Sequence, residues 1–201
     1  GREDEINTCI ACNQACLDHT FSRITSSCLV NPRACHETEL NYLPAKLKKR
    51  IAVVGAGPAG LAYATIAAER GHQVTLFDAA DEIGGQFNLA KKIPGKEEFY
   101  ETLRYFRRVI ELHDVDLKLG QAVTAEQLMR GLFDHVVIAT GVVPRKPEIE
   151  GINHEKAVLY FDVINGNKPV GDKVAIIGAG GIGFDVCELI SHSGSSGAVD
   201  R

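Results

Sequence analysis

One glycine-rich stretch, residues 51–78, constrains the fold of this chain more than any other part of the sequence. Ile51–Val54 is a short apolar run rich in β-branched residues, which predicts a buried parallel strand. Immediately after it come three glycines in the G-x-G-x-x-G spacing, Gly55, Gly57 and Gly60. An Ala-rich helix over 59–70 and a second strand over 74–77 are expected to follow. This order of strand, glycine turn, helix and strand predicts a Rossmann-like unit of the α/β class.

The glycines and the acid that ends the second strand have distinct roles in such a unit. Gly55 allows the tight turn, Gly57 lets the backbone approach a pyrophosphate, and Gly60 lets the helix pack close to the sheet. Asp78 follows Gly55 by 23 residues, close to the roughly 20 typical of the acid that holds a ribose hydroxyl. The free N–H groups at the helix N-terminus also favour phosphate. The stretch therefore predicts a dinucleotide site.

Two further segments are expected to reach this site. The adjacent glycines of the run Ile83–Gln86, Gly85 among them, suggest backbone that passes close to a ligand, although a plain turn is the alternative. Phe133–Ala139 predicts another buried strand, and ligands of open α/β sheets lie at the carboxyl ends of the strands. The residues that end this strand are Ala139, Thr140 and Gly141.

Apolar residues at helical spacing predict an amphipathic helix between these segments. They are Phe99, Leu103, Phe106 and Ile110. Three arginines of the same stretch are expected on its solvated side, namely Arg104, Arg107 and Arg108.

Residues 174–183, VAIIGAGGIG, repeat the opening pattern. The glycines in the motif positions are Gly178, Gly180 and Gly183. This predicts a strand, a glycine turn and the start of a helix in a second Rossmann-like domain. Asp185, within that helix start, is expected to be a surface or capping residue. Two such motifs suit a protein that holds a flavin dinucleotide on one domain and a nicotinamide dinucleotide on the other.

Five of the six cysteines lie in residues 1–49, a stretch with little helical or strand periodicity. Four of them have the spacing C-x2-C-x3-C-x11-C and are the candidate metal ligands, Cys9, Cys12, Cys16 and Cys28. Three thiolates within eight residues can wrap one face of an iron–sulfur cube, and a distant fourth closes it. Structural zinc and a disulfide framework are alternatives. Cys35 could replace Cys28, although a small buried residue near the site is the simpler interpretation.

Composition limits the other function classes. The 201 residues suffice for one domain and part of another, and 45% hydrophobic and 24% charged residues are ordinary for a globular protein. The sequence has no signal peptide and no apolar run of 18 residues, so a cytoplasmic protein without a membrane partner is expected. The net charge of −4 argues against general nucleic-acid binding. Because the chain begins at Gly1 and ends soon after the second motif, we expect the middle of a longer polypeptide.

The two glycine motifs and the cysteine segment, taken together, favour an iron–sulfur cluster over zinc. A flavin takes a hydride as two electrons and can return them singly, whereas a cluster takes one electron at a time. A flavin between a nicotinamide and a cluster therefore converts two-electron into one-electron transfer.

The sequence resembles the bacterial 2,4-dienoyl-CoA reductases, NADPH-dependent iron–sulfur flavoenzymes of unsaturated fatty-acid β-oxidation, of the NADH:flavin oxidoreductase or trimethylamine dehydrogenase type. The segments that carry the resemblance are CIACNQAC (9–16), SCLVNPRACHE (27–37), AVVGAGPAGLA (52–62), GHQVTLFD (71–78), EIGGQFN (82–88), IPGKEEFYETLRY (93–105) and KVAIIGAGGIGFD (173–185). Trimethylamine dehydrogenase and other enoate reductases share the architecture less closely, which leaves the substrate open.

The resemblance implies a division of the chain by cofactor. A 4Fe-4S segment would span 1–49, the first part of a discontinuous, three-layer FAD-binding domain 50–160, and the start of an NAD(P)H-binding domain 161–201. The preceding FMN-binding β/α barrel, which would reduce an enoyl-CoA or dienoyl-CoA, is absent. Electrons would pass from NADPH to FAD, the cluster, FMN and the substrate. No residue of this chain is expected to be catalytic.

The resemblance also implies individual contacts. The cluster ligands would be the four cysteines Cys9, Cys12, Cys16 and Cys28. Further FAD contacts would be Pro58, Ala59, Gln86, Lys96 and the backbone of Val123, which would meet the adenine.

Overall fold

The computed structural model describes residues 1–192, so residues 193–201 of the predicted nicotinamide domain lie outside the described residues. The chain divides into two compact units. The first comprises Gly1–Phe87 and Glu98–Gly141, and the second comprises Asn88–Glu97 and the chain from Val142 onward. The boundaries predicted after residues 49 and 160 follow the expected cofactors, and they stay predictions.

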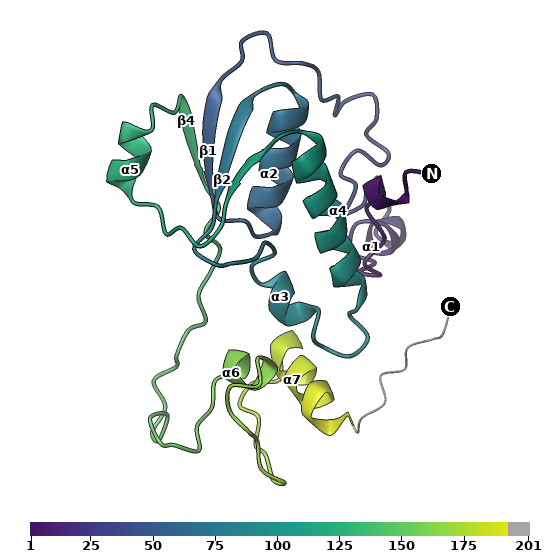
Figure 1. The fold of residues 1–201 in the computed structure, drawn as a ribbon. Helices are drawn as coiled ribbons and strands as arrows, with labels where there is room; N and C mark the ends of the chain where they lie inside the picture. The colour runs from purple at the N-terminus through teal and green to yellow at the C-terminus, as the bar shows by residue number, and fades with distance from the viewer. Residues whose placement is uncertain (193–201) are drawn as a thin grey trace. The chain divides into compact units, whose positions relative to one another are not determined.

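In the described part of the first unit, four parallel strands form one sheet with the order β3-β2-β1-β4 (Figure 1). The strands are β1 (Arg50–Val54), β2 (Gln73–Phe77), β3 (Asp116–Lys118) and β4 (His135–Ile138). The chain runs outward from β1 through β2 to β3 and then returns to the other side of β1. The order therefore reverses between β1 and β4, and open α/β sheets bind ligands at such a switch point. The predicted Rossmann-like α/β class is confirmed.

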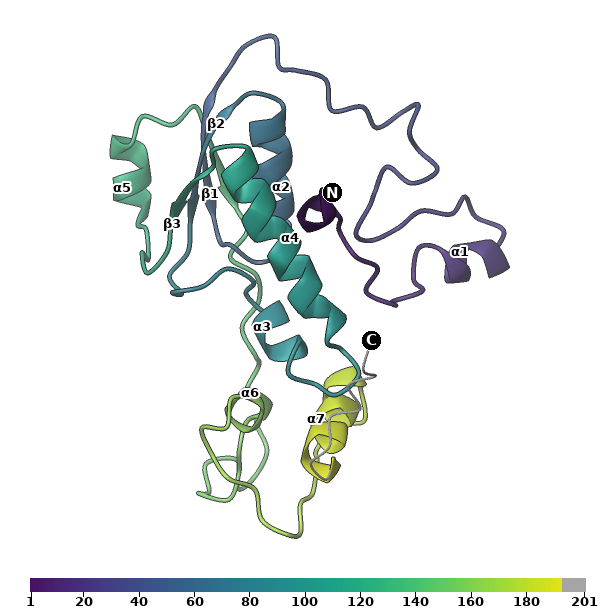
Figure 2. The same ribbon diagram turned by 45° about the vertical axis from the view of Figure 1, so that its right-hand side comes forward.

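Two helices pack on the same face of this sheet, α2 (Pro58–Glu69) and α4 (Glu98–Leu112) (Figures 1 and 2). Leu61 of α2 and Leu76 of β2 are fully buried, and Phe106 of α4 belongs to the same cluster. Replacing a buried leucine by alanine costs about 2–5 kcal/mol, so this layer contributes strongly to the stability of the first unit. α2 begins with a proline, which suits the first helical position because it has no N–H to satisfy.

The remaining elements are short. They are η1 (Glu3–Glu5), α1 (Leu17–Phe21), α3 (Phe87–Ala90), α5 (Ala125–Arg130), α6 (Tyr160–Ile164) and α7 (Gly181–Ser191). Thr124 and Gln127 form the capping box that starts α5. Apart from η1 and α1, residues 1–49 are irregular, as the sequence predicts. Within residues 1–192, no helix has the length and apolar character needed to cross a membrane.

Two predicted strands differ in the structure. The strand predicted as buried over Phe133–Ala139 is shorter, and Ile138 within it is 67% exposed. Among the described residues β4 pairs only with β1, so its other edge has no neighbour. The strand predicted before the second glycine motif is absent from the described residues, and Ile177 there is 78% exposed. A parallel strand needs a neighbour for its backbone hydrogen bonds, and the described part of the second unit provides none.

Candidate functional site

The first glycine turn joins β1 to α2 at the switch point of the sheet. Gly55 has a positive φ of 108°, and its N–H donates to the carbonyl of Phe77 at 2.7 Å. A Cβ on Gly55 would overlap the carbonyl oxygen of Ala139, and a Cβ on Gly60 would overlap that of Gly55. Both positions therefore require glycine for the turn and the helix to fit together. This agrees with the packing roles expected from the sequence.

Gly57, at the start of α2, differs from Gly55 and Gly60 because no contact in the described part of the chain requires a glycine there. This residue is the N-cap of α2 and has ordinary extended angles, φ −76° and ψ −179°. A Cβ on Gly57 would meet only the Cα of Gly85, at 3.9 Å. In the described structure the N–H groups of Ala59 and Gly60, which follow Pro58, have no acceptor, as is usual in a first helical turn. An open glycine beside free N–H groups fits a pyrophosphate.

Asp78 lies beside this turn at the carboxyl end of β2. Its carboxylate accepts hydrogen bonds from the N–H of Ala56 at 2.5 Å and from the N–H of Ala80 at 2.8 Å. Its backbone carbonyl accepts from the N–H of Gln121 at 2.8 Å. Each carboxylate oxygen has about two lone-pair sites, so each retains one for a ribose hydroxyl. The position fits the ribose contact that the sequence predicts.

The run Ile83–Gln86 lies against the glycine turn. The N–H of Gly84 donates to the carbonyl of Ala56 at 2.8 Å, and Gly85 has a positive φ of 51°. A Cβ on Gly85 would lie only 3.1 Å from the Cα of Gly57. The structure therefore brings Gly85 beside the predicted pyrophosphate position, and the next residue, Gln86, is exposed.

The end of β4 borders the same turn. The N–H of Ala139 donates to the carbonyl of Val54 at 2.8 Å, and its own carbonyl faces Gly55. Thr140 is exposed, and Gly141 has a positive φ of 72°. The three residues predicted to approach the dinucleotide thus follow β4 on the side of the turn.

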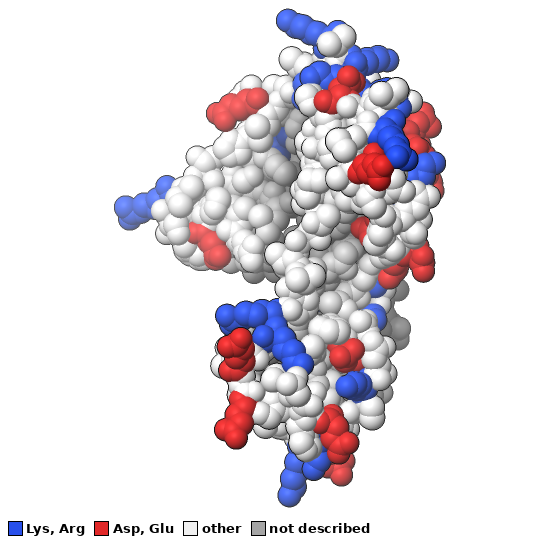
Figure 3. Space-filling model, turned by 90° about the vertical axis from the view of Figure 1, so that its left-hand side faces the viewer, with Lys and Arg blue, Asp and Glu red and all other residues white. Residues whose placement is uncertain are grey.

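A cavity of about 480 Å³ adjoins the end of β2 and is lined by Phe77, Val123 and Phe133 among others. Its volume lies within the roughly 300–1,000 Å³ typical of small-molecule sites. The rings of Phe77 and Phe133 pack edge to face, with centroids 6.2 Å apart. Figure 3, which views this side of the molecule, shows largely uncharged surface beside the charged groups of α5. An aromatic, uncharged lining suits a flat ring, and Val123 is the predicted adenine contact.

The second motif reproduces the geometry of the first, within the second unit. Gly178 has a φ of 119°, close to the 108° of Gly55. Gly180 is the N-cap of α7 with φ −90° and ψ −178°, and a Cβ on it would have nothing within 4 Å. A Cβ on Gly183 would overlap the carbonyl oxygen of Gly178, as at Gly60 in the first motif. The turn and helix of the predicted second dinucleotide site are therefore formed without the strand before them.

Lys96, a predicted flavin contact, forms an ion pair inside the second unit. Its Nζ lies 2.6 Å from both carboxylate oxygens of Asp185 in α7. The sequence suggested a surface or capping role for Asp185, and the separation of 89 residues offers no local signal for the pair. The flavin contact of Lys96 stays a prediction.

The predicted cluster ligands lie in the irregular N-terminal segment of the first unit. All six cysteines are free thiols, so no disulfide joins any of the described residues. Cys9 and Cys16 are exposed, and Cys12 and Cys28 are half-buried. The Sγ of Cys9 accepts the N–H of Ala11 at 3.4 Å.

The backbone around Cys12 suits an anionic thiolate group. Ala11 and Asn13 have φ values of 53° and 56°, which are uncommon for residues other than glycine. Such left-handed residues help turn successive N–H groups toward one point, as at many iron–sulfur sites. Within residues 1–192, no group of three or more His, Cys, Asp and Glu side chains is placed to hold a single metal ion. A cluster binds each thiolate through a different iron and so requires less convergence than one zinc ion. The metal at these cysteines stays a prediction.

The arginines Arg104 and Arg108 of α4, predicted to be solvated, are half-buried and bind residues 3–6. The third, Arg107, is 60% exposed as predicted. The sequence contains one signal for this contact, because the acidic run Glu3–Glu5 is opposite in charge to these arginines.

Comparison with protein families agrees with the geometry of the glycine turns. Residues 49–199 match the family described as pyridine nucleotide-disulphide oxidoreductase. The chain belongs to this family. Membership makes it an oxidoreductase chain and implies binding of a flavin and a nucleotide by this region.

This oxidoreductase chain is similar to a metal reductase of Desulforamulus reducens, 37% identical over 199 residues that cover 97% of the chain and 30% of the relative. The chain spans less than a third of the length of the curated relatives it matches. A solved complex of 2-naphthoyl-CoA reductase with 2-naphthoyl-CoA is 39% identical, with a TM-score of 0.89 over 94% of this chain and 29% of that one. Histamine dehydrogenase from Rhizobium sp. 4-9 is 32% identical, with a TM-score of 0.63 over 73% and 22%.

Proposed function

We propose that this chain is the electron-transfer part of an NADPH-dependent reductase of the 2,4-dienoyl-CoA reductase type. Electrons would pass from NADPH through FAD and a 4Fe-4S cluster to FMN in a preceding β/α barrel, where an enoyl-CoA or dienoyl-CoA is reduced. The observation that carries the proposal is the pair of glycine turns with the same geometry, one in each unit. A thiol-rich segment within the first unit would supply ligands for the one-electron centre.

The chain's own residues would bind and orient the groups of this relay. Free N–H groups at the start of α2 would hold the FAD pyrophosphate, and Asp78 would hold its ribose. The start of α7 would hold the nicotinamide dinucleotide through Gly180 and its neighbours. When bound, a flavin accepts a hydride pair and releases electrons singly, which matches a cluster ligated by Cys9, Cys12, Cys16 and Cys28.

A thioester substrate is supported by the similarity to 2-naphthoyl-CoA reductase. That protein acts on an acyl-CoA according to its name, and its structure matches 94% of this chain with a TM-score of 0.89. The matched part is the region that we propose to transfer electrons. The substrate of this protein is therefore inferred from a relative that shares this region over nearly the whole chain.

An amine dehydrogenase is the second candidate, because histamine dehydrogenase shares the same region. Its match covers 73% of this chain with a TM-score of 0.63, less than the match to the acyl-CoA reductase. We therefore rank an acyl-CoA thioester as the first candidate substrate and an amine as the second.

Metal and flavin analysis of the full-length protein tests the relay, and a substrate panel tests the reaction. We expect about four iron and four sulfide per chain, with FAD and FMN, after anaerobic purification. Oxidation of NADPH should then depend on a 2,4-dienoyl-CoA, and NADH and a methylated amine serve as comparisons. About one zinc without sulfide would refute the relay and make the cysteine segment structural. A normal cluster with turnover of amines only would favour the second candidate.

A further inference from the structure

Arg104 of α4 holds the backbone of the N-terminal segment. Its guanidinium donates to the carbonyls of Asp4 at 2.8 Å and of Ile6 at 3.0 Å, and lies 3.4 Å from that of Glu3. Its Nε donates to Glu101 of the same helix at 2.7 Å, which fixes the orientation of the side chain. One rigid fork of donors therefore binds two residues of η1, and Ile6 directly after it, to α4 (Figure 2).

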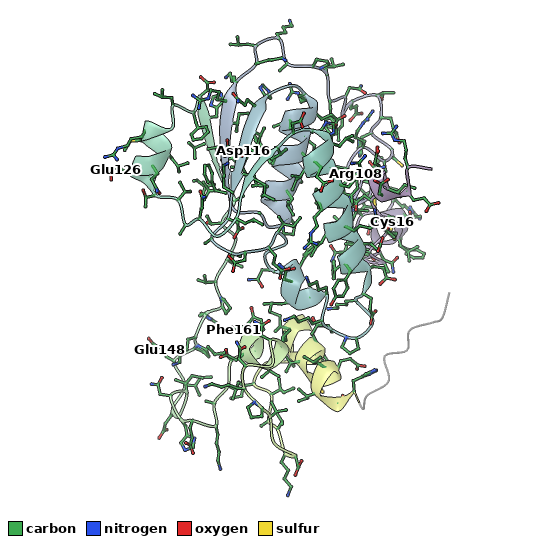
Figure 4. The ribbon with its side chains drawn as sticks, viewed as in Figure 1. Cys16, Arg108, Asp116, Glu126, Glu148 and Phe161 are labelled. Atoms are coloured by element: carbon green, nitrogen blue, oxygen red, sulfur yellow. The ribbon has the colours of Figure 1, made fainter. Side chains whose placement is uncertain are left out.

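Arg108, one helical turn further along α4, pairs with the acidic side chains of the same segment. Its Nε lies 2.7 Å from the carboxylate of Asp4, and a second nitrogen lies 3.6 Å from Glu5. A hydrogen bond from Arg2, with the charges of Arg2 and Arg108, holds the pKa of Glu5 below its ordinary range. Figure 4 labels Arg108 on α4 and Cys16 in the N-terminal segment. The intervening Arg107 is 60% exposed and reaches Glu82 only at 4.0 Å.

The attachment continues from Ile6 into the cysteine segment. Asn7, the next residue, donates from Nδ2 to the carbonyl of Val30 at 2.9 Å. Val30 lies two residues beyond the predicted ligand Cys28, and Cys9 lies two residues beyond Asn7. Fixing Ile6 on α4 therefore also restrains the first and last of the predicted ligands.

The rear of the segment is held on α2. The Nε of Arg70, at the end of α2, donates to the carbonyl of Leu43 at 3.1 Å. The N–H of Ala45 donates to the carbonyl of Arg70 at 2.8 Å. The cysteine segment is thus attached at both ends to the two helices that pack on the sheet.

We propose that Arg104 is a positioning residue for electron transfer between the flavin and the cluster. By binding residues 3–6 to α4, it keeps the cysteine ligands at a constant separation from the glycine turn of β1 and α2. The inference rests on the proposed function. Two electrons enter the flavin as a hydride from NADPH, and each cluster reduction consumes one of them. The rate of that second step depends on the separation, whereas the hydride step does not.

A matched pair of variants in the full-length holoenzyme, Arg104→Gln and Arg107→Gln, tests the proposal. For Arg104→Gln we expect unchanged iron and FAD, and unchanged flavin reduction by NADPH in anaerobic stopped flow. Cluster reduction, followed separately by its absorbance, should be slower. Amide hydrogen exchange of residues 3–6 should be about tenfold faster, since a lost charge-assisted hydrogen bond shifts local opening by at least that factor. Arg107→Gln should match the wild type in every measurement.

Wild-type cluster reduction in Arg104→Gln, despite faster exchange, would overturn the proposal. If Arg104→Gln loses iron, Asp4→Asn provides the milder change, because it weakens the pairing with Arg108 and leaves Arg104 in place. Faster exchange with an unchanged cluster-reduction rate in Asp4→Asn would equally overturn it. A wild-type enzyme without iron and sulfide refutes the proposed function and this inference together, whereas a normal cluster with unaltered rates refutes the inference only.

Discussion

Replacing Gly57 by alanine should separate FAD binding from folding. The residue has extended angles, and its Cβ would meet only the Cα of Gly85 at 3.9 Å. Losing a glycine at a compatible position stabilises a protein by about 0.4–1 kcal/mol, and losing a glycine N-cap costs a similar amount. The free energy of unfolding should therefore change by less than about 1 kcal/mol.

The same substitution should strongly lower the affinity for FAD if the pyrophosphate approaches Gly57. A Cβ there would displace at least one charge-assisted hydrogen bond between a backbone N–H and phosphate, worth about 1.5–3 kcal/mol. This corresponds to an affinity about 10- to 150-fold lower. Gly60→Ala should instead destabilise the fold, because its Cβ would overlap the carbonyl oxygen of Gly55. Over-packing of this kind costs about 1–3 kcal/mol or more.

The assay compares three variants of the full-length protein after removal of its flavin. Denaturant unfolding measures stability, and quenching of flavin fluorescence measures FAD affinity. Gly180→Ala is the matched control, because Gly180 holds the same position in the second motif and a Cβ there meets nothing within 4 Å. This variant should leave the affinity for FAD unchanged and lower the affinity for the nicotinamide dinucleotide. Wild-type FAD affinity in Gly57→Ala would refute the pyrophosphate assignment, and a large loss of stability would refute the reading of an open N-cap.

Three further outcomes follow from the site and its surroundings. Asp78→Asn should weaken FAD by about 1.5–3 kcal/mol, since an amide cannot accept from both flanking N–H groups and a ribose, and a flavin titration measures this. Cys12→Ala should abolish iron and sulfide while FAD is retained, whereas Cys35→Ala should keep the iron if Cys28 is the fourth ligand. Burial raises the pKa of Tyr105 above its ordinary 10.0, so the stability it contributes is complete below that value and is lost as pH rises through the higher folded pKa. The free energy of unfolding of Tyr105→Phe should accordingly fall less steeply with rising alkaline pH than that of the wild type.

The parts of the fold that the sequence predicts well have local causes. The predicted strand 51–54, helix 59–70 and strand 74–77 each lie within one residue of the observed elements. Hydrophobic periodicity, a proline at the first helical position and the spacing of glycines act within a few residues of chain. The glycine turns are predictable for the same reason, and Gly60 is required by the carbonyl of Gly55 in the same turn, whereas Gly55 is required by Ala139, far along the chain.

The parts that the sequence misses depend on neighbours far along the chain. The apolar run before Gly178 has the composition of a strand but no pairing partner among the described residues, so composition is insufficient. Arg104 carries the helical spacing of a solvated residue, yet the backbone it binds lies about 100 residues away. The pairing of Lys96 with Asp185 spans 89 residues. Each of these contacts is determined by tertiary packing, which the spacing of residues does not encode.

The two predicted cofactor sites of the first unit are connected through its helical layer. α2 begins at the glycine turn and ends at Glu69, and its C-cap residue, Arg70, holds the rear of the cysteine segment. A helix of 12 residues is about 18 Å long, so one rigid element joins the pyrophosphate position to this attachment. α4 packs in the same cluster through Phe106 and carries Arg104, which holds the front of the segment. Because a close-packed core transmits small displacements, the packing between α2 and α4 would determine the distance that an electron crosses in the proposed relay, although no core residue of either helix needs to touch a cofactor.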